Sequence, residues 1–304
     1  MFTLPDKLRG NPSQKLFAWN GLAFLTPASW ELAQTELSKG INRIVLEDDF
    51  SPRLELDWVD HPATHSRDTI QKNYQAQARA LTQAASGIIP IPDLPPEWTA
   101  HEYRMPDKRT MVIGYRIPGD EHSPFPLFRL HFDAHSRDLP AACFRQIANS
   151  LCWFNHGLVP WAFYDVAFAV NHELRLAATS LQAGRKTISF EWKLRRMTLW
   201  FISLANLALR TKGLPQYAAE FLNSTRIFPV PLWQPGQHDT LAYHRRKRYF
   251  LGQFEELGRL CFRYQATASL HPDRNQIQLQ MLQYRRASDL DVLTTTAIQL
   301  PPHP

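Results

Sequence analysis

The chain has 304 residues, of which 44% are hydrophobic and 20% are charged, a composition typical of a globular protein and not of a disordered one. It carries 34 Lys and Arg against 28 Asp and Glu, which gives a net charge of +6, and it has three cysteines. No apolar run is long enough for a transmembrane helix, and the first residues lack the apolar core of a signal peptide. We therefore expect a cytoplasmic protein with reduced thiols and no membrane partner.

In the first half, period-two alternation predicts strands and helical spacing predicts helices. Four strands are expected first, at residues 22–25, 30–37, 43–46 and 53–58, followed by a helix over residues 66–85. The proline-rich residues 88–98 are expected to form a loop, because proline is incompatible with a helix interior. Strands at residues 110–117 and 127–132 and a second helix beginning near Leu139 complete this half.

The second half repeats this order at an offset of 144 residues. Residues 23–47 and 167–191 are identical at nine of 25 positions without a gap. Strands are expected at residues 166–170, 173–181, 187–194 and 197–202, a broken helix at 204–222, strands at 260–267 and 276–284, and a last helix from Ser288. A period of this length predicts a duplicated domain and not a solenoid.

Residues 21–30, GLAFLTPASW, form a hairpin motif that resembles the PsbP-like family. This family includes the extrinsic P subunit of photosystem II and a Ran-binding nuclear import factor. The repeated order of strands and helices already predicts an α+β fold in which each half is an antiparallel sheet with helices packed on it. With the resemblance, we expect two tandem PsbP-like domains, residues 1–156 and 157–304, each an α/β/α sandwich. The resemblance also implies a binding or assembly role, since most members lack catalytic residues.

The best metal-binding candidates are His131, Asp133 and His135. On a strand, residues two apart point to the same face, so His131 and Asp133 would share a face, with His135 near the end of the strand. Imidazole and carboxylate together suit zinc or iron. The alternative is that both lie on the solvated face, opposite the core residues Phe128, Leu130 and Phe132. We expect no bound metal or cofactor.

The tetrapeptide His-Ser-Arg-Asp occurs twice, at residues 65–68 and 135–138, each time where a strand is followed by a helix. Ser and Asp side chains accept hydrogen bonds from free backbone N–H groups at a helix start, and Asp complements the helix dipole. The sequence therefore predicts that both segments cap helices, with a joint site built from them as the alternative.

The basic charge lies in the second half. Residues 1–156 carry 16 Lys and Arg and 18 Asp and Glu, a net of −2, whereas residues 157–304 carry 18 and 10, a net of +8. A basic surface with aromatic side chains is typical of nucleic-acid binding, and it also fits an acidic protein or the acidic half of a second copy. The candidate binding residues are Arg195, Arg196, Trp200, His244, Arg245, Arg246, Lys247, Arg248 and Tyr249.

No nucleophile elbow, phosphate-binding loop or dinucleotide-binding motif occurs in the sequence. The sequence therefore predicts a non-enzymatic binding or assembly subunit of a larger protein complex, and self-association is compatible with the uneven charge. The alternatives are a nucleic-acid-associated protein that uses the basic second half and a metal-dependent enzyme that uses His131, Asp133, His135 or His65.

Overall fold

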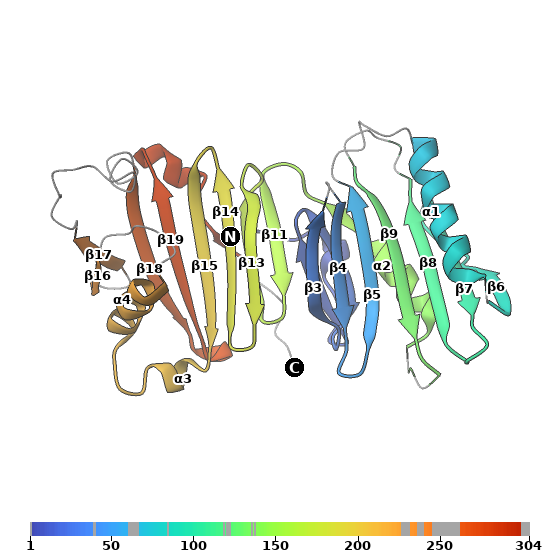
Figure 1. Ribbon diagram of the computed structural model, residues 1–304, viewed down its shortest axis with the longest axis horizontal. Coiled ribbons are helices and arrows are strands. Elements are labelled where there is room, and N and C mark those ends of the chain that lie inside the picture. Colours follow the sequence, from blue (N-terminus) through green and yellow to red (C-terminus); the bar gives the residue numbers. More distant parts are fainter. Residues whose placement is uncertain are drawn as a thin grey trace. The chain divides into compact units, whose positions relative to one another are not determined.

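The computed structural model describes residues 2–38, 41–59, 67–83, 85–117, 119, 123–134, 136, 138–225, 232–235, 240–244 and 262–298. The chain forms two compact units (Figure 1). Unit 1 consists of residues 1–155, 160–168 and 297–304, and unit 2 consists of residues 156–159 and 169–296.

Unit 1 contains a seven-stranded antiparallel sheet with the order β3-β4-β5-β9-β8-β7-β6. Alternation in the sequence produces the strands, because Leu54, Leu56 and Trp58 on one face of β5 are buried while the residues between them are partly exposed. The strands are β3 (Glu31–Ser38), β4 (Ile41–Glu47), β5 (Pro52–Val59), β6 (Gly87–Pro90), β7 (Trp98–Arg104), β8 (Thr110–Arg116) and β9 (Phe125–Phe132).

Helices cover both faces of this sheet (Figure 1). The helix α1 (Arg67–Thr82) packs Tyr74 and Ala78 on Ile113, Phe125 and Leu127. The helix α2 (Pro140–Ser150) lies on the opposite face, where the ring of Phe144 meets Phe128 with centroids 6.2 Å apart. A short helix, η1 (Asp6–Leu8), precedes the first strand.

A six-stranded sheet has the order β10-β2-β1-β11-β12-β20. Asn20 and Gly21 both have positive φ in the two-residue turn between its first two strands, the geometry that matches strand twist in a tight hairpin. The rings of Trp19, Trp161 and Phe163, all in unit 1, pack together in this sheet. Its strands are β1 (Gln14–Trp19), β2 (Leu22–Pro27), β10 (Cys152–Trp153), β11 (Leu158–Phe163), β12 (Val166–Asn171) and β20 (Thr296–Ala297).

Unit 2 contains a second seven-stranded antiparallel sheet, with the order β13-β14-β15-β19-β18-β17-β16. Trp200, Ile277 and Leu279 on one face pack against Ala218 and Leu222 of α4. The elements are β13 (Arg175–Gln182), β14 (Arg185–Trp192), β15 (Arg195–Ser203), α3 (Ala205–Ala208), α4 (Leu214–Thr225), β16 (Leu232–Pro235), β17 (Thr240–His244), β18 (Arg263–His271), η3 (Pro272–Arg274), β19 (Gln276–Tyr284) and η4 (Ala287–Asp291).

The two seven-stranded sheets have the same strand order, with β13 in the place of β3 and β16 in the place of β6. The pairing of β3 with β4 shifts register between Leu32 and Gln34, and the pairing of β13 with β14 shifts between Leu176 and Ala178. The two bulges are 144 residues apart, which is the offset of the sequence repeat.

The structure confirms an α+β fold of antiparallel sheets and corrects several predicted elements. Strands β1 and β11 were not predicted. Strand β6 overlaps the proline-rich residues 88–98 that were expected to form a loop, and β7 begins at the last of them, Trp98. The last helix is only the 3₁₀ turn η4. Capping by the second His-Ser-Arg-Asp segment is wrong, because the N-cap of α2 is Leu139, without a side-chain hydrogen bond, and Pro140 follows it.

Among the described residues, none of the helices combines the length and the apolar character needed to span a bilayer.

Gly114 of β8 gives a test of how α2 packs on the sheet. A Cβ atom at this position would lie 2.1 Å from Cζ of Phe144, so Gly114→Ala should force the ring out of its place. We expect a loss of about 2 kcal/mol in the free energy of unfolding, measured by urea denaturation. Gly87→Ala is the matched control, because a Cβ atom added there would have no neighbour within 4 Å, and it should change stability by less than about 0.5 kcal/mol. Equal effects of the two substitutions would contradict this packing.

Candidate functional site

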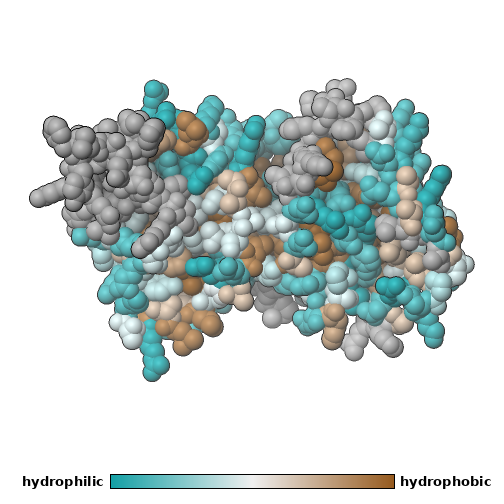
Figure 2. Space-filling model, viewed as in Figure 1, coloured by the Kyte–Doolittle hydropathy of each residue, from teal (hydrophilic) through white to brown (hydrophobic). Residues whose placement is uncertain are grey.

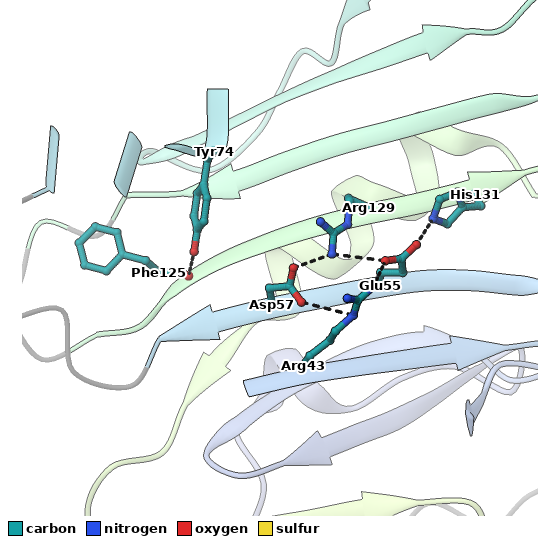
Figure 3. Close-up of polar contacts among 7 residues, drawn as sticks. All are labelled: Arg43, Glu55, Asp57, Tyr74, Phe125, Arg129 and His131. Atoms are coloured by element: carbon teal, nitrogen blue, oxygen red, sulfur yellow. Dashed lines mark hydrogen bonds and ion pairs between the residues drawn. The ribbon is translucent and has the colours of Figure 1, made fainter. Parts of the chain in front are cut away.

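A row of charged side chains crosses the centre of the unit 1 sheet, on the face that α1 covers further along (Figure 3). Arg43 comes from β4, Glu55 and Asp57 from β5, and Arg129 and His131 from β9. Glu55 is directly opposite Arg129 in the register, and diagonal neighbours on one face are also within reach of long side chains. Hydrophilic side chains accordingly predominate over these strands in Figure 2.

Glu55 is the centre of this row. Its carboxylate accepts a hydrogen bond of 2.6 Å from Nη2 of Arg43 and lies 3.0 Å from Nε2 of His131 and 3.3 Å from Nη2 of Arg129. The hydrogen bond with His131 is the main reason that the pKa of Glu55 is lowered to about 2, and the two arginines lower the pKa further against the effect of burial.

Asp57 completes the row, because its carboxylate lies 2.5 Å from Nη2 of Arg129 and 3.7 Å from Nε of Arg43. Nearby, the Tyr74 hydroxyl donates a hydrogen bond of 2.6 Å to the carbonyl of Phe125, and burial raises the pKa of this hydroxyl (Figure 3). The charges alternate in sign along the row and neutralise one another. The row therefore stabilises the sheet and holds one side of His131 in place.

His131 lines a groove of about 430 Å³ at one end of the unit 1 sheet. The β4–β5 turn, the β7–β8 turn and the end of β9 meet there, because β8 begins opposite the last residue of β9. Phe50 in the β4–β5 turn is 88% exposed. The groove is lined by Phe50, Ser51, Pro52, Arg53, Glu55, Met105, Arg109, Thr110, Met111, His131, Phe132 and Asp133.

Arg53 fixes the shape of this groove. Its guanidinium lies 2.6 Å from Asp48 and 3.0 Å from Asp133, and its side chain is 6% exposed. Asp48 also accepts hydrogen bonds from the backbone N–H groups of Phe50 and Ser51. Burial raises the pKa of Asp48, but these N–H groups and Arg53 outweigh it and leave the pKa below its usual value. The exposed Phe50 is thus carried by a turn that is tied to the sheet.

The structure does not bring the predicted metal ligands together. His131 is bonded to Glu55, whereas Asp133 is paired with Arg53, whose Nη1 also lies 3.5 Å from the backbone oxygen of His131. A guanidinium between two candidate ligands repels a cation. His135 is outside the described residues, and within the described part of the chain no group of three or more His, Cys, Asp or Glu side chains could hold a metal ion.

Arg195 of unit 2, predicted to bind a partner, holds its own domain together. Its Nε and Nη2 lie 3.0 and 3.1 Å from the carboxylate of Asp289 in η4, and its Nη1 donates to the carbonyl of Lys193. The hydrogen bond with Arg195 is the main reason that the pKa of Asp289 is lowered to about 2. Arg196 also has an internal partner, because it forms an ion pair with Glu191.

Trp200 lies in the core of unit 2 with 1% of its surface exposed, which corrects the prediction that its ring meets a partner. Its apolar neighbours Leu199 and Phe201 are also buried, so β15 is covered on both faces. His244 ends β17, but its side chain is not described. The remaining predicted residues, Arg245, Arg246, Lys247, Arg248 and Tyr249, lie outside the described residues.

The β14–β15 turn exposes a second large apolar side chain, which the sequence did not reveal. Lys193 and Leu194 have φ of 44° and 68°, and Leu194 is 73% exposed. Two positive φ angles are the geometry of a type I′ turn, where Asn and Gly are usual and a bulky residue is strained. Trp192 lies between Nζ of Lys193, 4.9 Å from its ring centroid, and the guanidinium of Arg195, 5.3 Å away. Such turns are recognised in a sequence by Gly or Asn at the two turn positions, and this turn has neither.

No protein-family model matches this chain, and no curated protein matches it. Among solved structures, the solution structure of cyanobacterial PsbP (CyanoP) from Synechocystis sp. PCC 6803 is 16% identical with a TM-score of 0.33, over 48% of this chain and 95% of that one. MucB in complex with MucA(peri) is 8% identical with a TM-score of 0.21, over 91% of this chain and 82% of MucB. Both resemblances are weak and carry no argument about function.

Acid should remove the contribution of Glu55 to stability. The pKa of Glu55 is lowered from 4.5 to about 2 by folding, so its contribution is complete above pH 4.5 and is lost as the pH falls toward 2. We expect Glu55→Gln to lower the free energy of unfolding by about 1–2 kcal/mol at pH 7, and by much less near pH 2. Urea denaturation across this pH range measures the free energy of unfolding of both proteins. Glu36→Gln, at an exposed position of β3, is the control, and a pH-independent effect of Glu55→Gln would refute the linkage.

Proposed function

We propose that the chain is a non-enzymatic protein-binding subunit of a larger complex, and that the groove beside Phe50 is its docking site. The observation that carries this proposal is an almost fully exposed Phe50 beside an apolar groove that Met105 and Met111 also line. Methionine side chains adapt to apolar partners, and an aromatic ring at a groove is typical of interface anchors. A fixed turn that presents such a ring loses little conformational entropy on binding.

The state of the polar groups supports binding over catalysis. The lowered pKa of Glu55 makes its carboxylate a weak proton acceptor. Arg53 is engaged by two carboxylates. The thiols of Cys143 and Cys152 are buried, and burial raises the pKa of both, which makes them poor nucleophiles. Binding needs none of these groups to change its protonation state.

We also infer that the two units are tandem copies of one PsbP-like domain. The identical strand order of the seven-stranded sheets supports this inference, as does the recurrence of a bulge at an offset of 144 residues. A bulge is a specific local irregularity that related domains tend to keep. Two copies of one binding fold would give the chain two surfaces that can diverge in charge and shape.

Phe50→Ser tests the docking site. A tagged chain is used to capture partners from its native host, with and without nuclease, and the partners are identified by mass spectrometry. We expect defined protein partners that survive nuclease, and we expect Phe50→Ser to reduce their recovery at least about tenfold, because it removes the anchor. Leu139→Ser is the matched control, since Leu139 is 73% exposed but does not line the groove.

Recovery of nucleic acid alone, or loss of every partner on nuclease treatment, would contradict the proposal and favour the basic second half as the binding surface. Equal loss of partners with Phe50→Ser and Leu139→Ser would show that the groove is not the docking site. Folding of each variant is checked by its melting temperature, which a substitution at an exposed turn should leave nearly unchanged.

A further inference from the structure

Corresponding ends of the two seven-stranded sheets carry opposite charge. The groove end of unit 1 contains the β4–β5 turn, the β7–β8 turn and the end of β9, and the corresponding end of unit 2 contains the β14–β15 turn, the start of β18 and the end of β19. Described acidic residues outnumber basic ones at the first end by five to three, and basic residues outnumber acidic ones at the second by six to three. The first set is Glu47, Asp48, Asp49, Asp107 and Asp133 against Arg53, Lys108 and Arg109, and the second is Lys193, Arg195, Arg196, Arg263, Arg285 and Arg286 against Glu191, Asp289 and Asp291.

Each of these ends also exposes one large apolar side chain at the corresponding turn. Phe50 is 88% exposed at the acidic end, and Leu194 is 73% exposed at the basic end. The two surfaces differ in shape, because Phe50 borders a groove, whereas Leu194 stands at the tip of a two-residue turn.

The basic turn is built as a rigid projection. Arg195 donates a hydrogen bond of 2.8 Å to the carbonyl of Lys193 and is itself held by Asp289, whose side chain is 5% exposed. The cations of Lys193 and Arg195, the residues on either side of Leu194, both contact the ring of Trp192. A rigid apolar tip flanked by cations is complementary to an apolar groove with acidic neighbours. Leu194 adopts the positive φ that this two-residue turn requires, and its side chain remains exposed.

From this complementarity we infer that the Leu194 turn of one molecule docks in the Phe50 groove of a second copy of this chain. This inference rests on the proposed function of the groove and names its occupant. The two surfaces are different, so the contact is head-to-tail. The salt dependence of the association should be strong, because Glu47 and Asp49 at one surface and Lys193 at the other are exposed to solvent.

Sedimentation velocity of the full chain over a range of concentrations and salt tests the inference. We expect concentration-dependent assemblies at low salt that dissociate at high salt. Leu194→Gly should weaken association about tenfold or more, while the melting temperature rises or stays unchanged, because glycine accepts the positive φ without strain. Leu207→Ser is the control in unit 2, since Leu207 is 61% exposed and lies far from the turn in the sheet, beyond the other end of β15.

An exchange of charge makes the test specific. Neither the Lys193→Glu/Arg196→Glu chain nor the Glu47→Lys/Asp49→Lys chain should associate with itself, whereas an equimolar mixture should associate as strongly as the unaltered protein. Association that is restored only in the mixture would establish head-to-tail contact between these two surfaces.

A chain that stays monomeric at low salt and high concentration would overturn this inference, as would association that Leu194→Gly leaves unchanged. The proposed function would stand in either case if Phe50→Ser still abolished capture of a different protein. Loss of that capture in the control Leu139→Ser as well would overturn the proposed function by itself.

Discussion

Arg53 ties the functional end of unit 1 together, because one buried guanidinium binds carboxylates from two separate segments. Asp48 belongs to the β4–β5 turn and Asp133 follows β9, and both pair with Arg53 at 3.0 Å or less. Through Asp48, the same cation indirectly fixes the backbone of Phe50. Removing one partner from such a group leaves a buried charge without compensation, so the position of the turn and the shape of the groove depend on this contact.

The comparable faces of the two seven-stranded sheets are covered in different ways. A seven-stranded sheet has two faces, and the side chains on each must be either covered or charged. In unit 1 the centre of one face carries the ion pairs of Glu55, Asp57 and their arginines, and α1 covers only the strands beyond. In unit 2 the comparable face carries Trp200, Leu279 and Met281, which α4 covers. In unit 1 the groove lies at the end of this uncovered row of charged side chains.

The sequence predicted strands and the long helices well where a pattern of period two or 3.6 was complete. It missed β1 and β11, since each is buried on both sides in its central part and shows no alternation. The sequence assigned Trp200 to a partner-binding surface, because the period of a strand does not show what covers each of its two apolar faces. It named His131 and Asp133 as candidate metal ligands, whereas the structure pairs them with Glu55 and Arg53. These partners lie about 80 residues away in the chain, and only the sheet register brings them close. The groove could not be predicted, because it joins three turns that are remote in sequence.

The turn at Lys193 and Leu194 is built from two residues that its backbone geometry disfavours. Left-handed backbone costs a bulky residue about 1 kcal/mol, and an exposed leucine gains nothing from burial within its own unit. Asn-Gly would form the same turn without either cost. In the first unit, the corresponding turn is longer and carries Phe50 without a positive φ, tied instead by Asp48. The two corresponding turns differ in structure, and each exposes a large apolar side chain beside a charged anchor. Local backbone chemistry does not require that result in either unit, and the proposed docking gives both side chains a role outside the fold that carries them.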